Sequence, residues 1–298
     1  MDQAAFQIYA AGDHTQPVTD TPPDLKELCQ QVTGKSFRRI GRFIQLSMIG
    51  AARCTQLSVP PGTAVYLASG RGDLELTVDI MTELFARAQA PKPLGFVNTV
   101  SNAACFYVAQ LLRLQSRSNY VCNRNFAFES VMQLAFTDLQ MGSVDSALIG
   151  SVDLCSAPLK EHRQRLHVSA DTVMGEGSHW LWLGKPDSSK PRIGEVLSAE
   201  HFVNRSALLA WSDGQSFSQL PDELALSRGQ FVSDALWHRI TADIKHESVF
   251  DYRNDRPYYD SQSGAVVGEF LRSNSPATTL LHINADNDDR CSVMLVRR

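Results

Sequence analysis

The sequence lacks the features that mark several protein classes. No apolar run approaches the roughly 20 residues that a bilayer-spanning helix needs. Basic and acidic residues nearly balance, with 28 Lys and Arg against 32 Asp and Glu, so no basic excess points to nucleic acid or an anionic membrane. Residues 1–15 contain an early acid and no basic segment, so we do not expect a secretory signal peptide.

Several chemical signatures are missing as well. The six cysteines show no C-x-x-C pairing, which indicates reduced thiols in the cytoplasm rather than a disulfide framework or a zinc site. His162 and His167 lie in a stretch with loop character, and no further metal ligands stand nearby. His179, His246 and His282 have the character of ordinary core or surface residues. No G-x-S-x-G, P-loop or dinucleotide fingerprint occurs, so we predict neither a cofactor nor a metal.

The most informative stretch that is present runs from Tyr120 to Gly142. A short apolar strand is followed by a sharp turn at Asn123–Arg124–Asn125 and then by a helix, in which Asn125 is the expected N-cap. Gly142 ends that helix, and 146–150 is a buried strand of β-formers. The helix carries one apolar stripe at spacings of three and four residues: Phe128, Val131, Met132, Ala135, Phe136 and Leu139.

This order of strand, sharp turn, helix and strand is how an α/β enzyme presents a nucleophile at a helix N-terminus. The residue presented here is Asn125, which cannot act as one. The remaining pattern predicts alternating strands and helices. We expect strands at Phe6–Ala11, Ala64–Ser69, Arg192–Ala199, Thr278–Asn284 and Cys291–Val296, helices at Asp24–Thr33, Lys35–Cys54, Asp73–Gln89, Asn102–Gln115, Gly229–Ile244 and Ser263–Arg272, and a turn at Asn287–Asp288.

The central stretch resembles the β-ketoacyl synthases, the condensing enzymes of fatty acid and polyketide synthesis with the thiolase fold. In that family seventeen residues separate the nucleophilic cysteine from a helix-ending glycine, and counting back from Gly142 gives Asn125. Upstream, residues 96–104 (FVNTVSNAA) resemble the family's V-P-N-T-x-x-N-x-A segment. Downstream, residues 175–183 (GEGSHWLWL) resemble its G-E-G-A-x-x-L-V-L segment.

The resemblance implies the fold class: α/β, a thiolase-like layered αβαβα arrangement with a complete first half and a shortened second half. We expect one domain over residues 1–298, made of a ketosynthase-like half (1–190) and a truncated C-terminal half (191–298). Members of the family usually have about four hundred residues. Roughly a hundred are therefore missing here, nearly all from the second half.

The resemblance also implies catalytic features that this sequence does not have. A condensing enzyme uses a cysteine thiolate to carry the acyl chain and two histidines to assist decarboxylation. Asn125 stands at the cysteine position, and no H-G-T-G-T string supplies the first histidine. Asp260 stands at the second histidine position, and residues 285–290 replace the family's glycine-rich G-F-G-G-x-N loop. We therefore predict no catalytic residues and no condensing activity for this chain on its own.

Silent homologues of this family work as chain length factors, which pair with an active ketosynthase in type II polyketide systems. This chain is similar to that class, and its shortening resembles the partners of aryl polyene ketosynthases. The resemblance implies a heterodimer with an active ketosynthase, transient contact with acyl carrier protein, no nucleic acid and no membrane span. It places Phe106, Tyr107, Gln110, Leu111, Tyr120 and Cys122 at the partner interface, and Arg71, Gly95, Phe96 and Phe126 along the acyl tunnel.

Two alternatives remain open from the sequence. Cys122 lies three residues before Asn125 and is the one competing nucleophile for an atypical acyltransferase or condensing enzyme. At the end of a strand we expect its thiol to be buried, with a raised pKa that disables it. The other alternative is a scaffold that docks acyl carrier protein through a basic helix face formed by Lys35, Arg38, Arg39 and Arg42.

Overall fold

The computed structural model describes residues 5–19, 21, 23–56, 58–100, 102–156, 158–214, 223–229, 232–242, 244, 246–253, 256–286 and 289–298. Within these residues ten strands form one sheet in the order β3-β2-β4-β5-β1-β6-β10-β9-β7-β8. The strands are β1 (Phe6–Pro17), β2 (Ala64–Ser69), β3 (Ser118–Cys122), β4 (Ser146–Asp153), β5 (Gly175–Gly184), β6 (Gly194–Phe202), β7 (Leu224–Arg228), β8 (Ser248–Val249), β9 (Thr279–Ala285) and β10 (Cys291–Arg297).

The sheet contains the same topology twice. In the first half, β1 pairs antiparallel with β5 and β5 with β4, whereas β4–β2 and β2–β3 are parallel. In the second half, β6 takes the place of β1, and the pairs β6–β10, β10–β9, β9–β7 and β7–β8 repeat the same directions. The halves join where β1 pairs with β6, from Phe6 opposite Val196 to Ile8 opposite Gly194.

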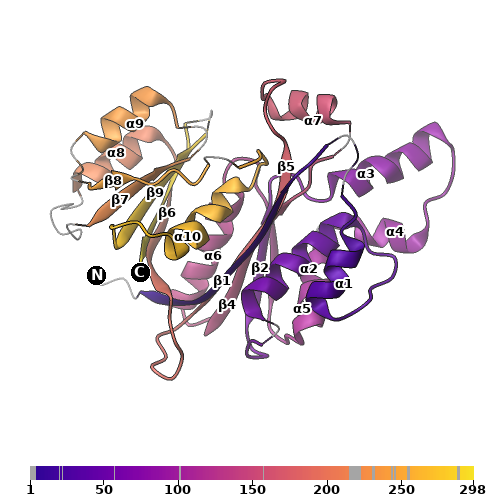
Figure 1. The fold of residues 1–298 in the computed structure, drawn as a ribbon, viewed down its shortest axis with the longest axis horizontal. Coiled ribbons are helices and arrows are strands. Elements are labelled where there is room, and N and C mark those ends of the chain that lie inside the picture. The colour runs from indigo at the N-terminus through magenta and orange to yellow at the C-terminus, as the bar shows by residue number, and fades with distance from the viewer. Residues whose placement is uncertain are drawn as a thin grey trace.

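Helices cover both faces of each half, which gives the layered αβαβα arrangement that was expected (Figure 1). The middle layer contains α6 (Ala127–Gln140) and α10 (Ala265–Arg272), whose apolar side chains share one core with strands of both halves. On the outside of the first half lie α1 (Lys26–Thr33), α2 (Arg42–Thr55) and α5 (Ala103–Leu112). On the outside of the second half lie α8 (Arg205–Gly214) and α9 (Asp234–Thr241).

The halves differ in the lengths of their connections. Between β2 and β3, residues 70–117 form α3 (Leu74–Met81), a π-helical turn η1 (Thr82–Ala86), α4 (Pro93–Asn98) and α5. The matching connection between β7 and β8, residues 229–247, contains only α9 among the residues described. Likewise, α7 (Leu159–Leu166) lies between β4 and β5, whereas residues 286–290 alone connect β9 to β10. The second half is therefore shortened in its connections, while its strand order is complete.

Several local predictions need correction. The helix predicted from Lys35 begins at Arg42, and the one predicted from Gly229 begins at Asp234, where the Ser233 side chain caps it. His162 lies in α7 and not in a loop. Helices α4, α7 and α8 and strand β7 were not predicted. The turn predicted at Asn287–Asp288 lies outside the described residues.

Candidate functional site

The expected site forms where the parallel strands β2, β3 and β4 end. Because they run in the same direction, their carboxyl ends meet at one edge of the sheet. Ser69 at the end of β2 donates its hydroxyl to the Asp153 carboxylate of β4 at 2.5 Å, and the Asn123 amide after β3 donates to the Ser69 carbonyl at 3.1 Å. The Gly70 amide also donates to Asp153, at 3.0 Å. The sequence thus brings the end of each strand to one point, as the family resemblance implies.

Asn125 lies in the turn between β3 and α6, at the place where the resemblance puts a nucleophile. Contrary to prediction, Asn125 is not the N-cap: Phe126 occupies that position, and no side chain caps the helix. The backbone carbonyl of Asn125 accepts a hydrogen bond from the Asn284 side chain of β9 at 3.3 Å. The turn is therefore held by the second half of the chain, through a residue that the sequence did not single out.

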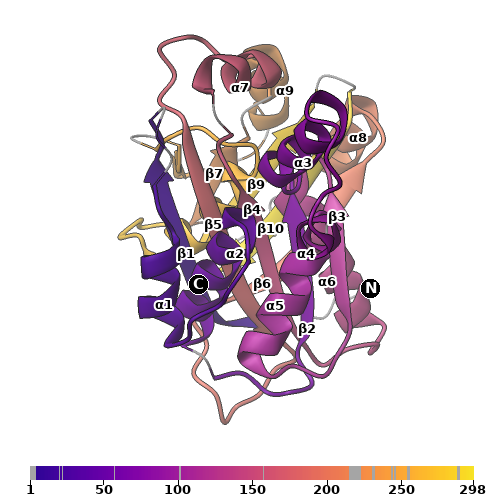
Figure 2. The same cartoon turned by 90° about the vertical axis from the view of Figure 1, so that its right-hand side faces the viewer.

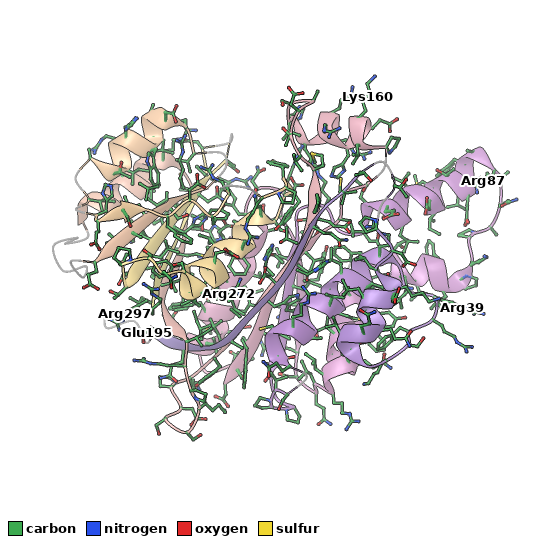
Figure 3. All side chains as sticks on the ribbon, viewed as in Figure 1. Arg39, Arg87, Lys160, Glu195, Arg272 and Arg297 are labelled. Atoms are coloured by element: carbon green, nitrogen blue, oxygen red, sulfur yellow. The ribbon has the colours of Figure 1, made fainter. Side chains whose placement is uncertain are left out.

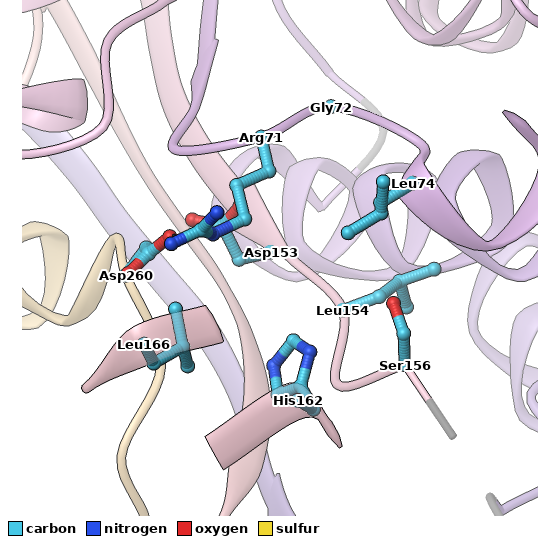
Figure 4. A pocket seen from close by; sticks show the side chains of 9 residues that line it. All are labelled: Arg71, Gly72, Leu74, Asp153, Leu154, Ser156, His162, Leu166 and Asp260. Carbon is cyan, nitrogen blue, oxygen red and sulfur yellow. The ribbon is translucent and has the colours of Figure 1, made fainter. Parts of the chain in front are cut away.

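Asp260, from the loop before the 3-10 turn η3 (Gln262–Gly264), reaches the same edge and forms an ion pair with Arg71 (Figure 4). The Arg71 Nε atom lies 2.8 Å from the Asp260 carboxylate, and its Nη2 atom donates to the Arg165 carbonyl at 3.1 Å. Gly70 permits this approach, because a Cβ at that position would lie 2.5 Å from the Asp260 Cβ. Residues far apart in the chain thus fill the site with their own side chains.

Burial is the largest cause of the pKa shifts of the acidic residues in this site. Burial first, and then the neighbouring Asp260 carboxyl, raise the pKa of Asp153 to about 7. Burial also raises the pKa of Asp260, although the Arg71 guanidinium opposes this shift. The buried imidazole of His162 has its pKa lowered to about 4, by burial first and then by Arg165 and Arg71. His162 is therefore neutral at pH 7.

The space left in this site is small. The cavity lined by Arg71, Asp153, His162 and Asp260 has a volume of about 10 Å³. A cavity of that size holds roughly one water molecule. An acyl chain cannot enter while the Arg71–Asp260 pair is in place.

Cys122 is the competing nucleophile that the sequence offered. Its side chain is exposed, contrary to the predicted burial, and its thiol lies 3.6 Å from the Gly70 carbonyl. Its pKa is nevertheless raised, by partial burial first and then by the Asp153 carboxyl. The Arg71 guanidinium opposes this shift without reversing it, so the thiol form is favoured.

The expected interface residues lie along one side of the molecule, where β3 forms an edge of the sheet and α5 packs beside it (Figure 2). Phe106 is 61% exposed and packs edge-on against the half-buried Tyr107. Gln110 and Cys122 are exposed, and Tyr120 is half-buried. Leu111 differs from the others because it points inward and is only 5% exposed.

The same side carries an apolar surface that the sequence analysis missed. It is formed by exposed side chains of α3, η1 and α4 and of the turn that leads to α5. The local signal was an apolar helix without a clear polar face. We call the following set the α3–α4 apolar surface: Val78, Met81, Leu84, Phe85, Leu94, Phe96, Val97 and Val100.

The four residues predicted for the acyl tunnel lie in different places. Arg71 lies in the filled site, whereas Gly95 and Phe96 lie on α4, where Phe96 is 56% exposed. Phe126 is 2% exposed and, together with Asn123, lines an open cavity of about 260 Å³ beside Asn125. Within this one chain they do not enclose a common tunnel.

The predicted basic helix face is also changed. Arg42 is removed from it, because its guanidinium contacts the fully buried Glu176 carboxylate at 2.7 Å and Glu75 at 3.1 Å. Lys35, Arg38 and Arg39 are exposed but precede α2 rather than lying on it. Figure 3 shows Arg39 projecting outward on the same side as Arg87. An exposed basic segment remains, without helical regularity.

A second buried polar cluster joins the halves behind the α6 N-terminus. Glu129 of α6 is fully buried, and its carboxylate lies 3.5 Å from the His282 imidazole of β9. It accepts hydrogen bonds from Asn284 at 2.7 Å and from Ser263 at 3.1 Å. Burial alone would raise the Glu129 pKa, but His282 and Asn284 hold it below its ordinary value.

Comparison with known proteins bears on the fold. No protein-family model matches the sequence, and a search of curated proteins returns no match. Among solved structures, the ishigamide ketosynthase/chain length factor matches with a TM-score of 0.76 at 14% identity, over 99% of both chains. The chain has the thiolase-like fold of the ketosynthases. The other similar structures support the same conclusion.

A type II polyketide acyl-carrier protein in complex with its ketosynthase bound to the hexaketide matches with a TM-score of 0.76 at 10% identity, over 99% of both chains. A beta-ketoacyl synthase from Burkholderia phymatum matches with a TM-score of 0.72 at 11% identity, again over 99% of both chains. Among the described residues, helices are too short or too polar to cross a bilayer.

Proposed function

We propose that this chain is a non-catalytic, chain length factor-like subunit that forms a heterodimer with an active ketosynthase. The observation that carries the proposal is the state of the site at the ends of β2, β3 and β4. Asn125 stands where a nucleophile is needed, and the Arg71–Asp260 pair leaves about 10 Å³ of free space. A site without a nucleophile has no means of covalent acyl transfer.

The partner surface supports the second part of the proposal. An edge strand presents unpaired backbone groups, and proteins usually cover such edges. Here β3 lies beside the α3–α4 apolar surface and the exposed ring of Phe106. Grouped exposed apolar side chains next to a strand edge are typical of protein interfaces. A ketosynthase presents a strand edge of the same kind, because the solved ketosynthases share this fold.

The exposure of Phe96 supports a role in the partner's acyl tunnel. Phe96 lies within the α3–α4 apolar surface and is 56% exposed, so in a heterodimer its ring is available to the partner. We propose that Gly95 and Phe96 shape the ketosynthase's acyl tunnel from outside, in a pathway of the polyketide or aryl polyene type. Exposed Lys35, Arg38 and Arg39 provide complementary charge for transient contact with an acidic acyl carrier protein.

The test is co-expression with candidate ketosynthases, followed by size-exclusion chromatography with light scattering. We expect a one-to-one complex, and poor solubility of this chain without its partner. Phe106→Asp places a charge in the middle of the interface and should abolish the complex. Val249→Asp is the matched control, because Val249 is 55% exposed on β8 in the second half.

Two results would contradict the proposal. One is a stable, monodisperse monomer or homodimer that ignores every ketosynthase offered. The other is acyl transfer by the purified chain that is lost in Cys122→Ser, which would favour the atypical enzyme. Salt-sensitive binding of acyl carrier protein with no ketosynthase present would favour the docking scaffold instead.

A further inference from the structure

The α3–α4 apolar surface lies on a part of the chain that packs little against the rest. Helices α3 and α4, joined through η1, project outward from one side of the molecule, and we call residues 74–98 the arm (Figure 1). Of residues 77–100, all of which the structure describes, only Ile80 and Asn98 are buried. A segment with so few buried contacts belongs to the least stable part of a fold. Its orientation therefore depends on the contacts at its two ends.

The first end of the arm is fastened where α3 begins. The guanidinium of Arg42, the first residue of α2, contacts the Glu75 carboxylate of α3 at 3.1 Å and the buried Glu176 carboxylate of β5 at 2.7 Å. Asp73, the N-cap residue of α3, lies against Gly41, where a Cβ would be 3.3 Å from the carboxylate of Asp73. Arg42 thus ties the start of the arm to the sheet.

The second end of the arm is fastened where α4 ends. Asn98 is 6% exposed, and its side-chain amide donates to the Arg39 backbone carbonyl at 3.2 Å. Arg39 has a φ of 61°, in the left-handed region that is unfavourable for a residue with a Cβ. Such a conformation persists only where the surrounding structure holds it. Both ends of the arm therefore rest on residues 39–42, the short segment that leads into α2.

We propose that Arg42 and Asn98 are positioning residues, which hold the arm in the orientation that presents the α3–α4 apolar surface to the ketosynthase. The inference rests on the proposed partner role and adds the contacts that prepare the surface for binding. A surface already held in its bound orientation loses less conformational freedom on association, so it binds more tightly than a mobile one. Without these contacts the same apolar side chains stay exposed, but the affinity for the partner falls.

The test removes both contacts from the arm, so that Arg42 keeps its ion pair with the buried Glu176. Glu75→Ala and Asn98→Ala are combined in one double variant. Asp79→Ala is the matched control, because Asp79 is an exposed acid one turn further along α3. Each protein is the full chain, and hydrogen–deuterium exchange with mass spectrometry is suitable because it needs only dilute protein.

In the double variant, the amides of residues 76–98 should exchange about tenfold faster than in wild type, since a hydrogen bond and a partly exposed ion pair each contribute a few-fold. Ketosynthase affinity, measured by biolayer interferometry, should fall by about tenfold as well, because the arm must then be ordered on binding. Asp79→Ala should match wild type in both measurements. The urea midpoint should not move in either variant, whereas a merely structural role of these contacts would lower it.

Three results would overturn the proposal. The first is exchange in the arm that is no faster in the double variant than in wild type. The second is faster exchange over the whole chain together with a lower urea midpoint. The third is faster exchange in the arm with unchanged ketosynthase affinity. A wild-type chain that binds no ketosynthase would contradict the proposed function and this proposal with it, whereas wild type and double variant binding equally well would contradict this proposal alone.

Discussion

The two halves of the sheet have the same strand order but present different surfaces to their surroundings. In the first half, residues 70–117 extend between β2 and β3 and carry the α3–α4 apolar surface. In the second half, the corresponding connection is residues 229–247, which contains α9. It leads to β8, which has only the two residues Ser248–Val249. The comparison shows that the two halves share their strand order, whereas their connections differ and place the α3–α4 apolar surface on the first half.

The halves also differ in what they bring to the central layer. The first half supplies α6 with its buried Glu129, and the second half supplies the His282, Asn284 and Ser263 side chains around that carboxylate. Neither half alone supplies the hydrogen-bond partners of these buried polar groups. The cluster therefore makes the stability of each half depend on the other.

The largest expected effect comes from breaking that junction. Glu129→Ala leaves His282, Asn284 and Ser263 buried without their shared partner. Each buried polar group left without its partner costs about 1–3 kcal/mol, which gives a total of about 3–5 kcal/mol for this cluster. We expect a loss of that size in the free energy of unfolding, measured by urea denaturation. Glu161→Ala, at an exposed position of α7, is the control and should change stability by less than about 0.5 kcal/mol.

Truncating one core leucine in each half tests whether the halves unfold together. Leu67 of β2 and Leu226 of β7 occupy corresponding strands and are both fully buried. Replacing either with Ala should cost about 2–5 kcal/mol. Because the halves share a sheet and a central core, each variant should show one urea transition by both far-ultraviolet circular dichroism and tryptophan fluorescence. Two separated transitions in Leu226→Ala would mean that the halves are independent.

The third expectation concerns pH and the filled site of the first half. The folded pKa of Asp153, about 7, lies above its ordinary value of 3.8. The folded state therefore binds this proton more tightly, and the group's contribution to stability is lost as pH rises from about 4 to 7. Asp153→Asn removes this loss. Between pH 5 and 7.5 the variant should gain about 2–3 kcal/mol relative to wild type, at ~1.4 kcal/mol per pKa unit.

The measurement is the difference in unfolding free energy between variant and wild type at several pH values. The difference is needed because His162, whose folded pKa is lowered to about 4, contributes in the opposite direction in both proteins. A difference that does not change with pH would show that Asp153 ionises normally.

The smallest expected effect is on thiol reactivity. Cys122 of the first half is exposed, whereas Cys29, Cys54, Cys105, Cys155 and Cys291 are buried. Native protein at pH 8 should therefore incorporate one iodoacetamide per chain, several times more slowly than free cysteine because the Cys122 pKa is raised. Cys122→Ser should remain unlabelled, and a bound ketosynthase should protect the thiol. Labelling of Cys291 instead would indicate that the second half opens first.

Local sequence pattern predicted a good part of the fold. The bounds of β2 were predicted correctly, and the apolar stripe of α6 faces the central core as its spacing indicated. The absence of a nucleophile at Asn125 was also readable, because it depends on residue identity alone. Helix starts were less reliable. Phe126 rather than Asn125 is the N-cap, since the turn is held from outside by Asn284.

The tertiary structure alone decided how the site is filled. Arg71 and Asp260 come from different halves, as do Glu129 and His282, and no local periodicity links them. Arg42 is another example. It was predicted to lie on a basic helix face, but it forms an ion pair with the buried Glu176 instead. By itself the sequence determined most of the longer strands, the central helix and the lack of a nucleophile at Asn125, because these depend on neighbouring residues. Which charges meet, and how much space they leave, was decided by chain segments that lie far apart in the sequence and become neighbours only in the folded chain.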